Sequence, residues 1–271
     1  MPLVVVPTPI GNLEDITLRA LRVLREADVI ACEDTRRTGR LLAHYEIENR
    51  GRLVAYHEHN EARKAPELAA RAREETVALV CDAGTPLVSD PGHRLVSACI
   101  EAGVRVEALP GPSAALTALV ASGLPPEGAV FVGFPPRSGG ERTRLFERIG
   151  VEAATFVLYE SPHRLAATLG ELPKEAPVAV CRELTKLHEE IFHGTAAEAL
   201  ARFSGGRGEV KGEISLVVRG GAAREETGPE EALALARRYV EAGESPSKAA
   251  ARAARETGLK KGELYDRLVS E

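Results

Sequence analysis

The sequence has little of what disulfide frameworks, metal clusters and membrane anchors are built from. It has 4 cysteines, Cys32, Cys81, Cys99 and Cys181, and none of them belongs to a CxxC pair. Neither a zinc cluster nor a disulfide framework is therefore indicated. No apolar run reaches the length of a bilayer span, and no charged segment of the signal-peptide type precedes the first apolar stretch. These absences predict a cytoplasmic protein with no bound metal and no membrane contact.

Two further absences concern phosphate and nucleic acid. Gly11 stands alone after the first apolar run, at 3–6, so both a GxGxxG fingerprint and a P-loop are missing. Lys and Arg total 35 against 40 Asp and Glu, which gives a net charge of −5. Because affinity for nucleic acid depends on neutralising phosphates, this balance argues against a diffusely basic nucleic-acid binder. Any contact with RNA must then come from local patches.

Three loops rich in proline and glycine follow predicted strands. Residues 82–92 read Asp-Ala-Gly-Thr-Pro-Leu-Val-Ser-Asp-Pro-Gly after a strand at 77–81. Pro-Thr-Pro-Ile-Gly-Asn at 7–12 and Pro-Gly-Pro-Ser at 110–113 follow strands in the same way. Proline fixes φ and glycine lets the main chain approach a ligand closely. In an open α/β sheet, ligands bind outside the carboxyl ends of strands, so these loops predict a preformed ligand site. Each loop alone is equally compatible with a structural turn between a strand and a helix.

The order of apolar patterns predicts an α/β fold. Strand-like and helix-like runs alternate over 1–112, which indicates a parallel three-layer domain. Residues 113–221 hold strand-like runs with fewer helices, and we expect a mixed sheet in a second α/β domain. These strands are expected at 129–133, 155–159, 177–181, 189–193 and 214–218. Residues 222–271 are helical in pattern, with helices expected at 230–241, 248–257 and 260–270, and resemble a helix-turn-helix.

The loops belong to a longer series of motifs that run in order along the chain. They are Pro-Thr-Pro-Ile-Gly-Asn-Leu-Glu-Asp-Ile-Thr (7–17), Cys-Glu-Asp-Thr-Arg (32–36), the 82–92 loop, Pro-Gly-Pro-Ser (110–113), Tyr-Glu-Ser-Pro-His-Arg (159–164), Arg-Glu-Leu-Thr-Lys (182–186) and Gly-Glu-Ile-Ser-Leu-Val (212–217). On these motifs the chain resembles the tetrapyrrole (corrin/porphyrin) methylase superfamily. Within it, the resemblance is to the branch that 2′-O-methylates a cytidine in the decoding region of 16S rRNA. The resemblance implies a two-domain fold, S-adenosylmethionine (AdoMet) as cofactor, the small ribosomal subunit as substrate, and a homodimer.

The resemblance also implies which residues contact AdoMet between the two domains. The implied contacts are Pro9, Ile10, Thr85, Val88, Ser113, Ala114, Tyr159, Glu160, Ser161, Cys181, Arg182 and Ile214. Corrin methylases carry Gly-Asp-Pro where this chain has Gly84-Thr85-Pro86, so one carboxylate of the family pattern is missing.

Two segments are candidates for contact with RNA. Arg36, Arg37 and Arg40 follow the strand at 29–31, and arginine can bind phosphate oxygens with two hydrogen bonds. Tyr56, His57 and His59 lie in a polar loop where an unpaired base could stack or hydrogen-bond. The alternatives are a solvated charged face for the arginines and a metal site for the histidine pair, which lacks a third ligand nearby in sequence.

A ribose hydroxyl is a weak nucleophile, and a general base accelerates its attack roughly 10²–10⁴-fold. Candidates for that base are Asp34, Asp90, Glu160, Glu183 and Lys186, and the sequence does not choose among them. The motif around Glu160 also has a structural interpretation, in which Ser161 caps a helix, Pro162 occupies its first position and Arg164 pairs with an acid.

Two other functions compete with rRNA methylation. The first is methylation of a tetrapyrrole or corrin ring, against which the arginine loop, the helical tail and Thr85 argue. The second is a non-catalytic ribosome-binding module, which has no need of three preformed cleft loops. The helical tail carries six basic and four acidic residues over 245–271, and RNA contact and simple packing are both open for it.

Overall fold

The protein is described by a computed structural model, which covers residues 1–204, 211–221, 229–257 and 259–269. It divides into two compact units, Met1–Gly220 and Gly221–Glu271. Most of the loop expected at 204–208 lies outside the described residues. In the covered ranges, no helix combines the length and the apolar character needed to cross a bilayer.

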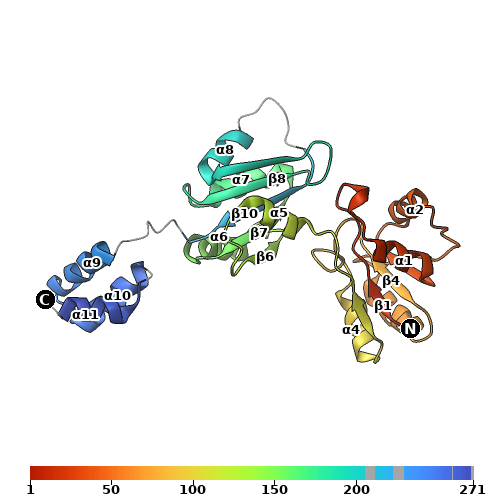
Figure 1. The fold of residues 1–271 in the computed structure, drawn as a ribbon, viewed down its shortest axis with the longest axis horizontal. Coiled ribbons are helices and arrows are strands. Elements are labelled where there is room, and N and C mark those ends of the chain that lie inside the picture. Colours follow the sequence, from red (N-terminus) through yellow and green to blue (C-terminus); the bar gives the residue numbers. More distant parts are fainter. Residues whose placement is uncertain (205–210, 222–228, 258, 270–271) are drawn as a thin grey trace. The chain divides into compact units, whose positions relative to one another are not determined.

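The first sheet is five-stranded and parallel, in the order β3-β2-β4-β1-β5. Two of its strands, β1 and β4, are labelled in Figure 1. Its strands are β1 (Leu3–Val5), β2 (Val29–Cys32), β3 (Leu53–Ala55), β4 (Val77–Val80) and β5 (Val106–Ala108). Alternate residues point to opposite faces, so Leu3 and Leu79 join one core cluster and Val4 and Ala78 join the other. Both faces are apolar, as expected for a parallel sheet covered on both sides.

Helices cover each face of this sheet. They are α1 (Leu18–Glu26), α2 (Thr35–His44), α3 (Glu61–Arg71) and α4 (His93–Glu101), with a short 3-10 helix at Leu13–Asp15. Leu24 of α1 and Leu42 of α2 pack on one face, and Leu68 of α3 and Leu95 of α4 pack on the other. The predicted three-layer arrangement and the cap at Thr17, which accepts a hydrogen bond from the Ala20 amide, are confirmed.

The second sheet is mixed, in the order β6-β7-β10-β8-β9. Its strands are β6 (Val130–Gly133), β7 (Thr155–Glu160), β8 (Pro177–Arg182), β9 (Glu190–Thr195) and β10 (Ile214–Arg219). Only the β6–β7 pair is parallel. Helices α6 (Gly140–Val151), α7 (Pro162–Glu171) and α8 (Ala196–Ser204) bury one face, and α5 (Ala114–Ser122) packs on the other.

The predicted fold class is confirmed, with three local differences. The sequence pattern predicts fewer helices in the second α/β domain, but the described residues hold α5–α8 there against α1–α4 in the first. The edge strand β3 is missing from the prediction, since three residues that are mostly half-exposed give too short a pattern. Ser161 precedes α7 as expected, and its carbonyl accepts from the Arg164 and Leu165 amides, but its side chain makes no capping hydrogen bond. The boundary predicted between residues 112 and 113 stays a prediction.

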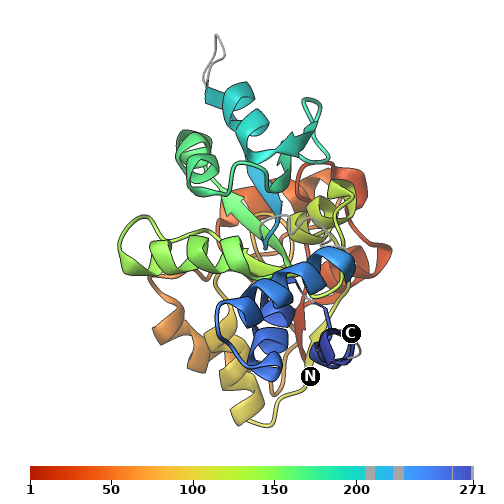
Figure 2. The ribbon, with the colours of Figure 1, turned by 90° about the vertical axis from the view of Figure 1, so that its left-hand side faces the viewer.

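The carboxyl-terminal unit holds α9 (Pro229–Glu241), α10 (Pro246–Thr257) and α11 (Lys261–Val269) (Figure 2). Helix α10 begins before the predicted residue 248, because proline is tolerated in a first helical turn. A tail of about fifty residues is expected to have little core of its own, and the core that it has is small. Ala232, Ala236, Ala250, Ala253 and Leu264 form a small buried core, since alanines let the helices approach closely.

Candidate functional site

The three loops predicted from sequence are tied to one another by hydrogen bonds. Thr8 and Gly84 exchange backbone hydrogen bonds of 2.8 and 2.9 Å, which joins the β1 loop to the β4 loop. The Thr85 hydroxyl donates to the Pro112 carbonyl at 2.9 Å, which joins the β4 loop to the β5 loop. The Thr8 hydroxyl also donates to the Cys81 carbonyl at 3.0 Å. The three loops therefore form one preformed edge of the first sheet.

The loop at 82–92 also holds backbone conformations that its residues rarely adopt. Leu87 and Ser89 have φ values of 72° and 66°, in the left-handed region. Such conformations cost of order 1–3 kcal/mol each and persist only where surrounding contacts impose them. Gly92 has a φ of 142°, and a Cβ there would lie 2.8 Å from the Leu87 side chain. This loop is therefore shaped at a cost in stability, as is common at ligand sites.

The second sheet reaches this edge through the loop that follows β8. The Asn12 amide donates to the Thr185 hydroxyl at 3.0 Å. A Cβ on Gly11 would overlap Lys186 Cγ and would lie 2.9 Å from the Leu184 carbonyl oxygen. The main chain of the β1 loop is thus in van der Waals contact with the β8 loop. Only glycine at position 11 permits this approach.

We expect Gly11→Ala to lower the free energy of unfolding by about 1–3 kcal/mol, because the Leu184 main chain has to move to admit the methyl group. Chemical denaturation followed by circular dichroism measures the change. Gly39→Ala is the matched control: a Cβ at this position in α2 meets only Leu53 Cδ1, at 3.8 Å. That control should gain about 0.5–1 kcal/mol, as alanine does over glycine within a helix. Equal stability of the two variants would contradict the close contact at Gly11.

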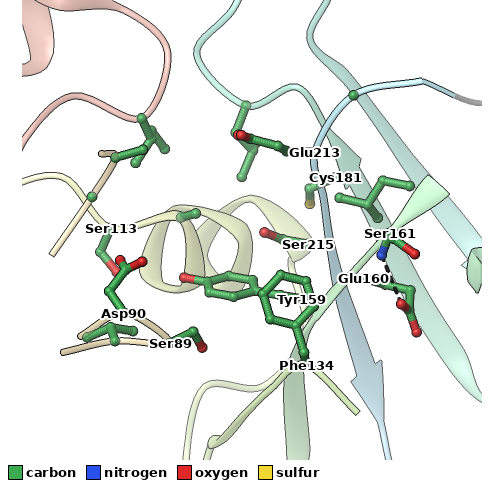
Figure 3. Close-up of a pocket in the computed structure, with 18 of the residues that line it drawn as sticks. Ser89, Asp90, Ser113, Phe134, Tyr159, Glu160, Ser161, Cys181, Glu213 and Ser215 are labelled. Carbon is green, nitrogen blue, oxygen red and sulfur yellow. Dashed lines mark hydrogen bonds between the residues drawn. The ribbon is translucent and has the colours of Figure 1, made fainter. Parts of the chain in front are cut away.

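Between the loops of the two sheets lies a cavity of about 370 Å³ (Figure 3). Small-molecule sites typically have about 300–1,000 Å³. The cavity is lined by Ile10, Ala83, Gly84, Thr85, Val88, Ser89, Asp90, Ser113, Ala114, Phe134, Tyr159, Glu160, Ser161, Pro162, Cys181, Leu184, Gly212, Glu213, Ile214 and Ser215. It is the first of two neighbouring cavities and is called the main cavity below.

Most residues predicted to contact AdoMet line the main cavity. Two do not. Pro9 lines the neighbouring cavity instead, and Arg182 forms an ion pair with Glu190 at 3.0 Å. The Ser113 hydroxyl accepts from the Leu116 amide as the predicted cap of α5. The roles of all these residues toward a cofactor stay predictions.

Asp90 differs from the other candidate bases in its surroundings. Its side chain lines the main cavity, and Figure 3 shows the carboxylate on the same side of it as Ser113 and Ser89. Burial raises the pKa of Asp90 to about 6. A hydrogen bond from the Cys81 thiol acts against this rise in pKa, and repulsion from Glu33 and Asp82 adds to it. A carboxylate with a pKa near that value is a better proton acceptor than an ordinary aspartate and is still ionised at neutral pH.

The carboxylate of Glu160 is engaged in hydrogen bonds within the protein. Glu160 is 2% exposed, accepts from the Thr168 hydroxyl at 2.6 Å and accepts from the Ser161 amide at 2.8 Å. Arg164 also approaches it at 3.5 Å, as the structural interpretation of this motif predicts. The Glu160 carboxylate is thus held between Thr168, Arg164 and the start of α7.

The remaining candidates are also engaged with partners. Asp34 caps α2, and its hydrogen bond with Arg36 lowers the pKa of its carboxyl group to about 2, which makes it a weak base. Glu183 accepts from Lys186 at 2.8 Å, and this contact lowers the pKa of Glu183. Asp90 therefore fits the role of a base best.

A second cavity of about 440 Å³ adjoins the main cavity and shares Ile10, Ala83 and Glu213 with it. It is called the basic cavity below, because Arg37, Arg40, His44 and Lys186 all line it. Arg37 forms an ion pair with Asp82 at 3.3 Å, whereas no ion pair of Arg40 occurs among the described residues. Arg36 points elsewhere and pairs with Asp34. Of the three predicted arginines, the structure thus brings Arg37 and Arg40 together at a concave surface.

The segment at 56–59 does not support base stacking by its tyrosine. Tyr56 is 1% exposed and packs in the core of the first sheet, so the prediction that it stacks on RNA is wrong. The apolar ring follows β3 directly and fills space beside α3 and α4. His59 is exposed and His57 half-buried, but neither lines the two cavities. Among the described residues no group of three or more His, Cys, Asp and Glu is arranged to hold a metal ion.

Sequence reasoning missed Phe134, Ser89 and Ser215. Ser215 lies on β10, inside an apolar strand pattern, and is 5% exposed. Ser89 and Phe134 are exposed loop residues, and Phe134 directly follows β6. The available signal was the motif Gly-Glu-Ile-Ser-Leu-Val for Ser215 and the strand end for Phe134. Neither pattern alone indicates a cavity.

Comparison with known families supports a relation over nearly the whole chain. The family model described as Tetrapyrrole (Corrin/Porphyrin) Methylases matches residues 2–200, and a model of the RsmI C-terminal HTH domain matches residues 226–271. The ribosomal RNA small subunit methyltransferase I of Escherichia coli O157:H7 is 47% identical, over 97% of this chain and 93% of that protein. The protein of the same name from Mesorhizobium japonicum is 47% identical, over 98% of this chain and 91% of its own length.

Solved structures agree with this relation. Uroporphyrin-III-C-methyltransferase from Thermus thermophilus is 28% identical with a TM-score of 0.54, over 80% of this chain and 93% of its own. A structure of that enzyme complexed with S-adenyl homocysteine has a TM-score of 0.53 at 24% identity, over 80% of this chain and 97% of its own, and so supports the fold alone. The chain therefore belongs to the tetrapyrrole methylases and, within them, to the family of the ribosomal RNA small subunit methyltransferase I proteins.

Proposed function

We propose that this protein transfers a methyl group from AdoMet to the 2′-hydroxyl of a cytidine in the decoding region of 16S rRNA. The observation that carries the proposal is the pairing of two adjoining cavities with different chemistry. The main cavity is largely apolar and includes Asp90, a carboxylate whose pKa is raised. The basic cavity has arginine side chains suited to phosphates. A nucleotide in a chain requires both, because its reacting ribose and its flanking phosphates lie side by side.

The main cavity suits AdoMet in size and lining. Ile10, Cys181 and Ile214 supply buried apolar walls for the adenine, and the main chain of the three tied loops supplies polar groups. Ser161 presents a hydroxyl that its helix does not use as a cap. When bound, the sulfonium supplies an activated methyl group, so much of the rate comes from positioning. Glu213 and Asp90 are the acidic side chains within reach of a positively charged ligand there, beside the engaged Glu160.

Asp90 is the residue we assign as general base. It would accept the proton of the ribose hydroxyl as that oxygen attacks the methyl carbon. The backbone conformations of Leu87 and Ser89 set the course of the loop that carries Asp90. Proton transfer requires the acceptor to lie within hydrogen-bond distance of the hydroxyl.

The direct test is methylation of small ribosomal subunits that lack the modification, with AdoMet and the purified protein. A single ribose-methylated cytidine should appear, detected as one linkage resistant to alkaline hydrolysis. Methylation on a base, or on a tetrapyrrole offered in its place, would contradict the proposal. Naked 16S rRNA should be assayed beside the subunit, because the geometry of the cavities does not distinguish the two.

A tetrapyrrole substrate is the alternative that the family relation keeps open. Its carboxylates would also suit arginines, so the basic cavity alone does not separate the two substrates. Threonine at position 85, in place of the aspartate of the corrin methylases, does separate the two substrates. The Thr85 hydroxyl donates to the Pro112 carbonyl and ties two loops together. The helical unit that follows residue 220 also has a separate core, which suits an accessory RNA-binding function.

We expect the double variant Arg37→Ala/Arg40→Ala to bind small subunits more weakly and with a flatter salt dependence. Each lost phosphate contact reduces the slope of log K against log salt by up to about one unit. AdoMet affinity should stay unchanged, since neither arginine lines the main cavity. Arg22→Ala/Arg25→Ala is the matched control, because both residues are exposed on α1 outside the two cavities. The same slope in both double variants would return the arginine loop to a solvated face.

The homodimer stays a proposal, supported by one surface. Helix α5 is apolar on all sides, and Leu116 and Val120 are 64% and 83% exposed at positions one turn apart. A helix of this composition is normally buried, so a second copy of the chain is a reasonable cover for it.

A further inference from the structure

Phe134 places a large apolar ring at the opening of the main cavity. It is 58% exposed and directly follows Gly133, the last residue of β6. Its ring meets the Tyr159 ring edge to face, with centroids 5.6 Å apart and an interplanar angle of 62°. Because the two rings are not stacked, phenyl surface of Phe134 stays open to a third planar group.

The backbone beside Phe134 is held by two arginines. Arg164 Nη2 donates to the Pro135 carbonyl at 2.8 Å and to the Pro136 carbonyl at 3.2 Å. Arg142 Nη1 donates to the same Pro136 carbonyl at 2.9 Å. Together with the two prolines, which restrict φ, these contacts fix the main chain immediately after the ring.

A buried network in turn orients the two arginines. Arg142 is 8% exposed, pairs with Glu171 at 2.7 Å and donates to the Thr168 hydroxyl at 3.1 Å. Thr168 donates to Glu160, which also pairs with Arg164. Burying a charge costs free energy unless the charge is paired and hydrogen-bonded. Here the buried charges are paired with one another, and together they hold a single loop in place. The loop that this network positions carries the exposed ring of Phe134. The network therefore holds that ring at a defined position beside the cavity.

The ring and the candidate base border the same opening. Tyr159 contacts Phe134, and Tyr159 and Asp90 both line the main cavity. A Cβ on Gly133 would lie 2.9 Å from the Ser89 hydroxyl, so the β6 loop directly contacts the loop that holds Asp90. Figure 3 shows Asp90, Ser89, Tyr159 and Phe134 along one side of the cavity, and Cys181 and Glu213 on the other.

We propose that Phe134 is the stacking platform for the base of the target nucleotide, which leaves its neighbours in the RNA and places its ribose at Asp90. This inference rests on the proposed function. The enclosed apolar end at Ile10, Leu184 and Ile214 suits the cofactor's adenine, which leaves the exposed ring for the substrate. Enzymes that act on one nucleotide commonly extrude it, and unpaired bases stack on aromatic side chains.

The test compares Phe134→Ala with Phe134→Trp and with Phe131→Ala. Phe131 is the matched control: it is 43% exposed and contacts the same Tyr159 ring at 5.2 Å, but it does not line the cavity. Phe134→Ala should lower kcat/KM for small subunits roughly 5- to 150-fold, the range that corresponds to loss of one base–aromatic stack. Phe134→Trp should restore most of that loss, and Phe131→Ala should stay within about twofold of the wild type.

AdoMet affinity, measured by calorimetry on the same variants, separates the possible roles of the ring. Unchanged affinity together with reduced kcat/KM supports stacking on the substrate. A matching loss of AdoMet affinity in Phe134→Ala would assign the ring to the cofactor and overturn the inference. Full activity of Phe134→Ala beside an active wild type would also overturn it and leave the proposed function intact. A wild type inactive on subunits would overturn both.

Discussion

Asp90→Asn is expected to lower kcat for methylation of small ribosomal subunits by roughly 10²–10⁴-fold, the contribution typical of a general base. The amide has nearly the same size as the carboxylate but cannot accept the ribose proton. AdoMet affinity should change only a few fold, because the cavity keeps its shape. Single-turnover kinetics, which isolates the chemical step, is the measurement. Asp15→Asn is the control, since Asp15 is exposed and outside both cavities.

The dependence on pH sharpens this expectation. With the pKa of Asp90 raised to about 6, the base is ionised above that value and protonated below it. The wild-type rate should therefore fall as the pH drops through about 6, and the Asn variant should lack this step. A step of the same position and size in the variant would show that another group titrates.

The raised pKa of Asp90 also determines how the free energy of unfolding changes with pH. A raised carboxylate pKa means that the folded state binds the proton more tightly than the unfolded chain, whose aspartate has a pKa of 3.8. Stability from this group is thus present below pH 3.8 and is lost as the pH rises through about 6. Asp90→Asn should therefore be at least as stable as the wild type at neutral pH, and its loss of activity would not reflect unfolding.

Ala114→Phe should abolish measurable AdoMet binding, a loss of more than about 100-fold, since the ring would occupy a large part of a cavity of about 370 Å³. Ala114 lines that space at the start of α5, so the new ring extends into the cavity and is not forced into the core. Overpacked cores lose about 1–3 kcal/mol, and a smaller loss is expected here. Calorimetry and thermal unfolding measure the two effects.

The control for Ala114→Phe is Ala201→Phe, which adds the same ring at an exposed position of α8. It should bind AdoMet like the wild type. Wild-type affinity in Ala114→Phe would place the cofactor elsewhere and would leave the main cavity without its proposed ligand.

Much of the fold was predictable because its signals are local. Thr17 and Ser113 cap helices where sequence indicates, and the apolar runs at β1 and β4 are buried as expected. The site loops were also predictable, because proline restricts the backbone conformation and glycine widens the range of allowed conformations at any position. What could not be read was how polar side chains pair at a distance. Glu160 appears as a possible base in sequence, and only its contacts with Thr168 and Arg164 show that it is engaged.

Burial and orientation account for the other differences. Tyr56 lies in a polar stretch, yet one aromatic ring after a strand suffices to place it in the core. The three neighbouring arginines look equivalent in sequence, but Arg36 pairs with Asp34 at the start of α2, and only Arg37 and Arg40 line the basic cavity. Phe134 carries no sequence signal of its own, because its importance depends on loops that are distant in the chain.

The place of β10 in the second sheet has a consequence for synthesis on the ribosome. This strand is the last of its sheet in sequence, yet it lies in the middle, between β7 and β8. Until residue 219 has emerged, β7 and β8 have no common partner, and each keeps an unpaired edge that can bind another chain. The first sheet has all of its strands once Ala108 has emerged, so it can form before the second sheet is synthesised. A nascent chain that stalls between residues 108 and 219 carries a folded first sheet and an incomplete second sheet with exposed, aggregation-prone strand edges. Rapid translation of this stretch therefore favours a soluble product.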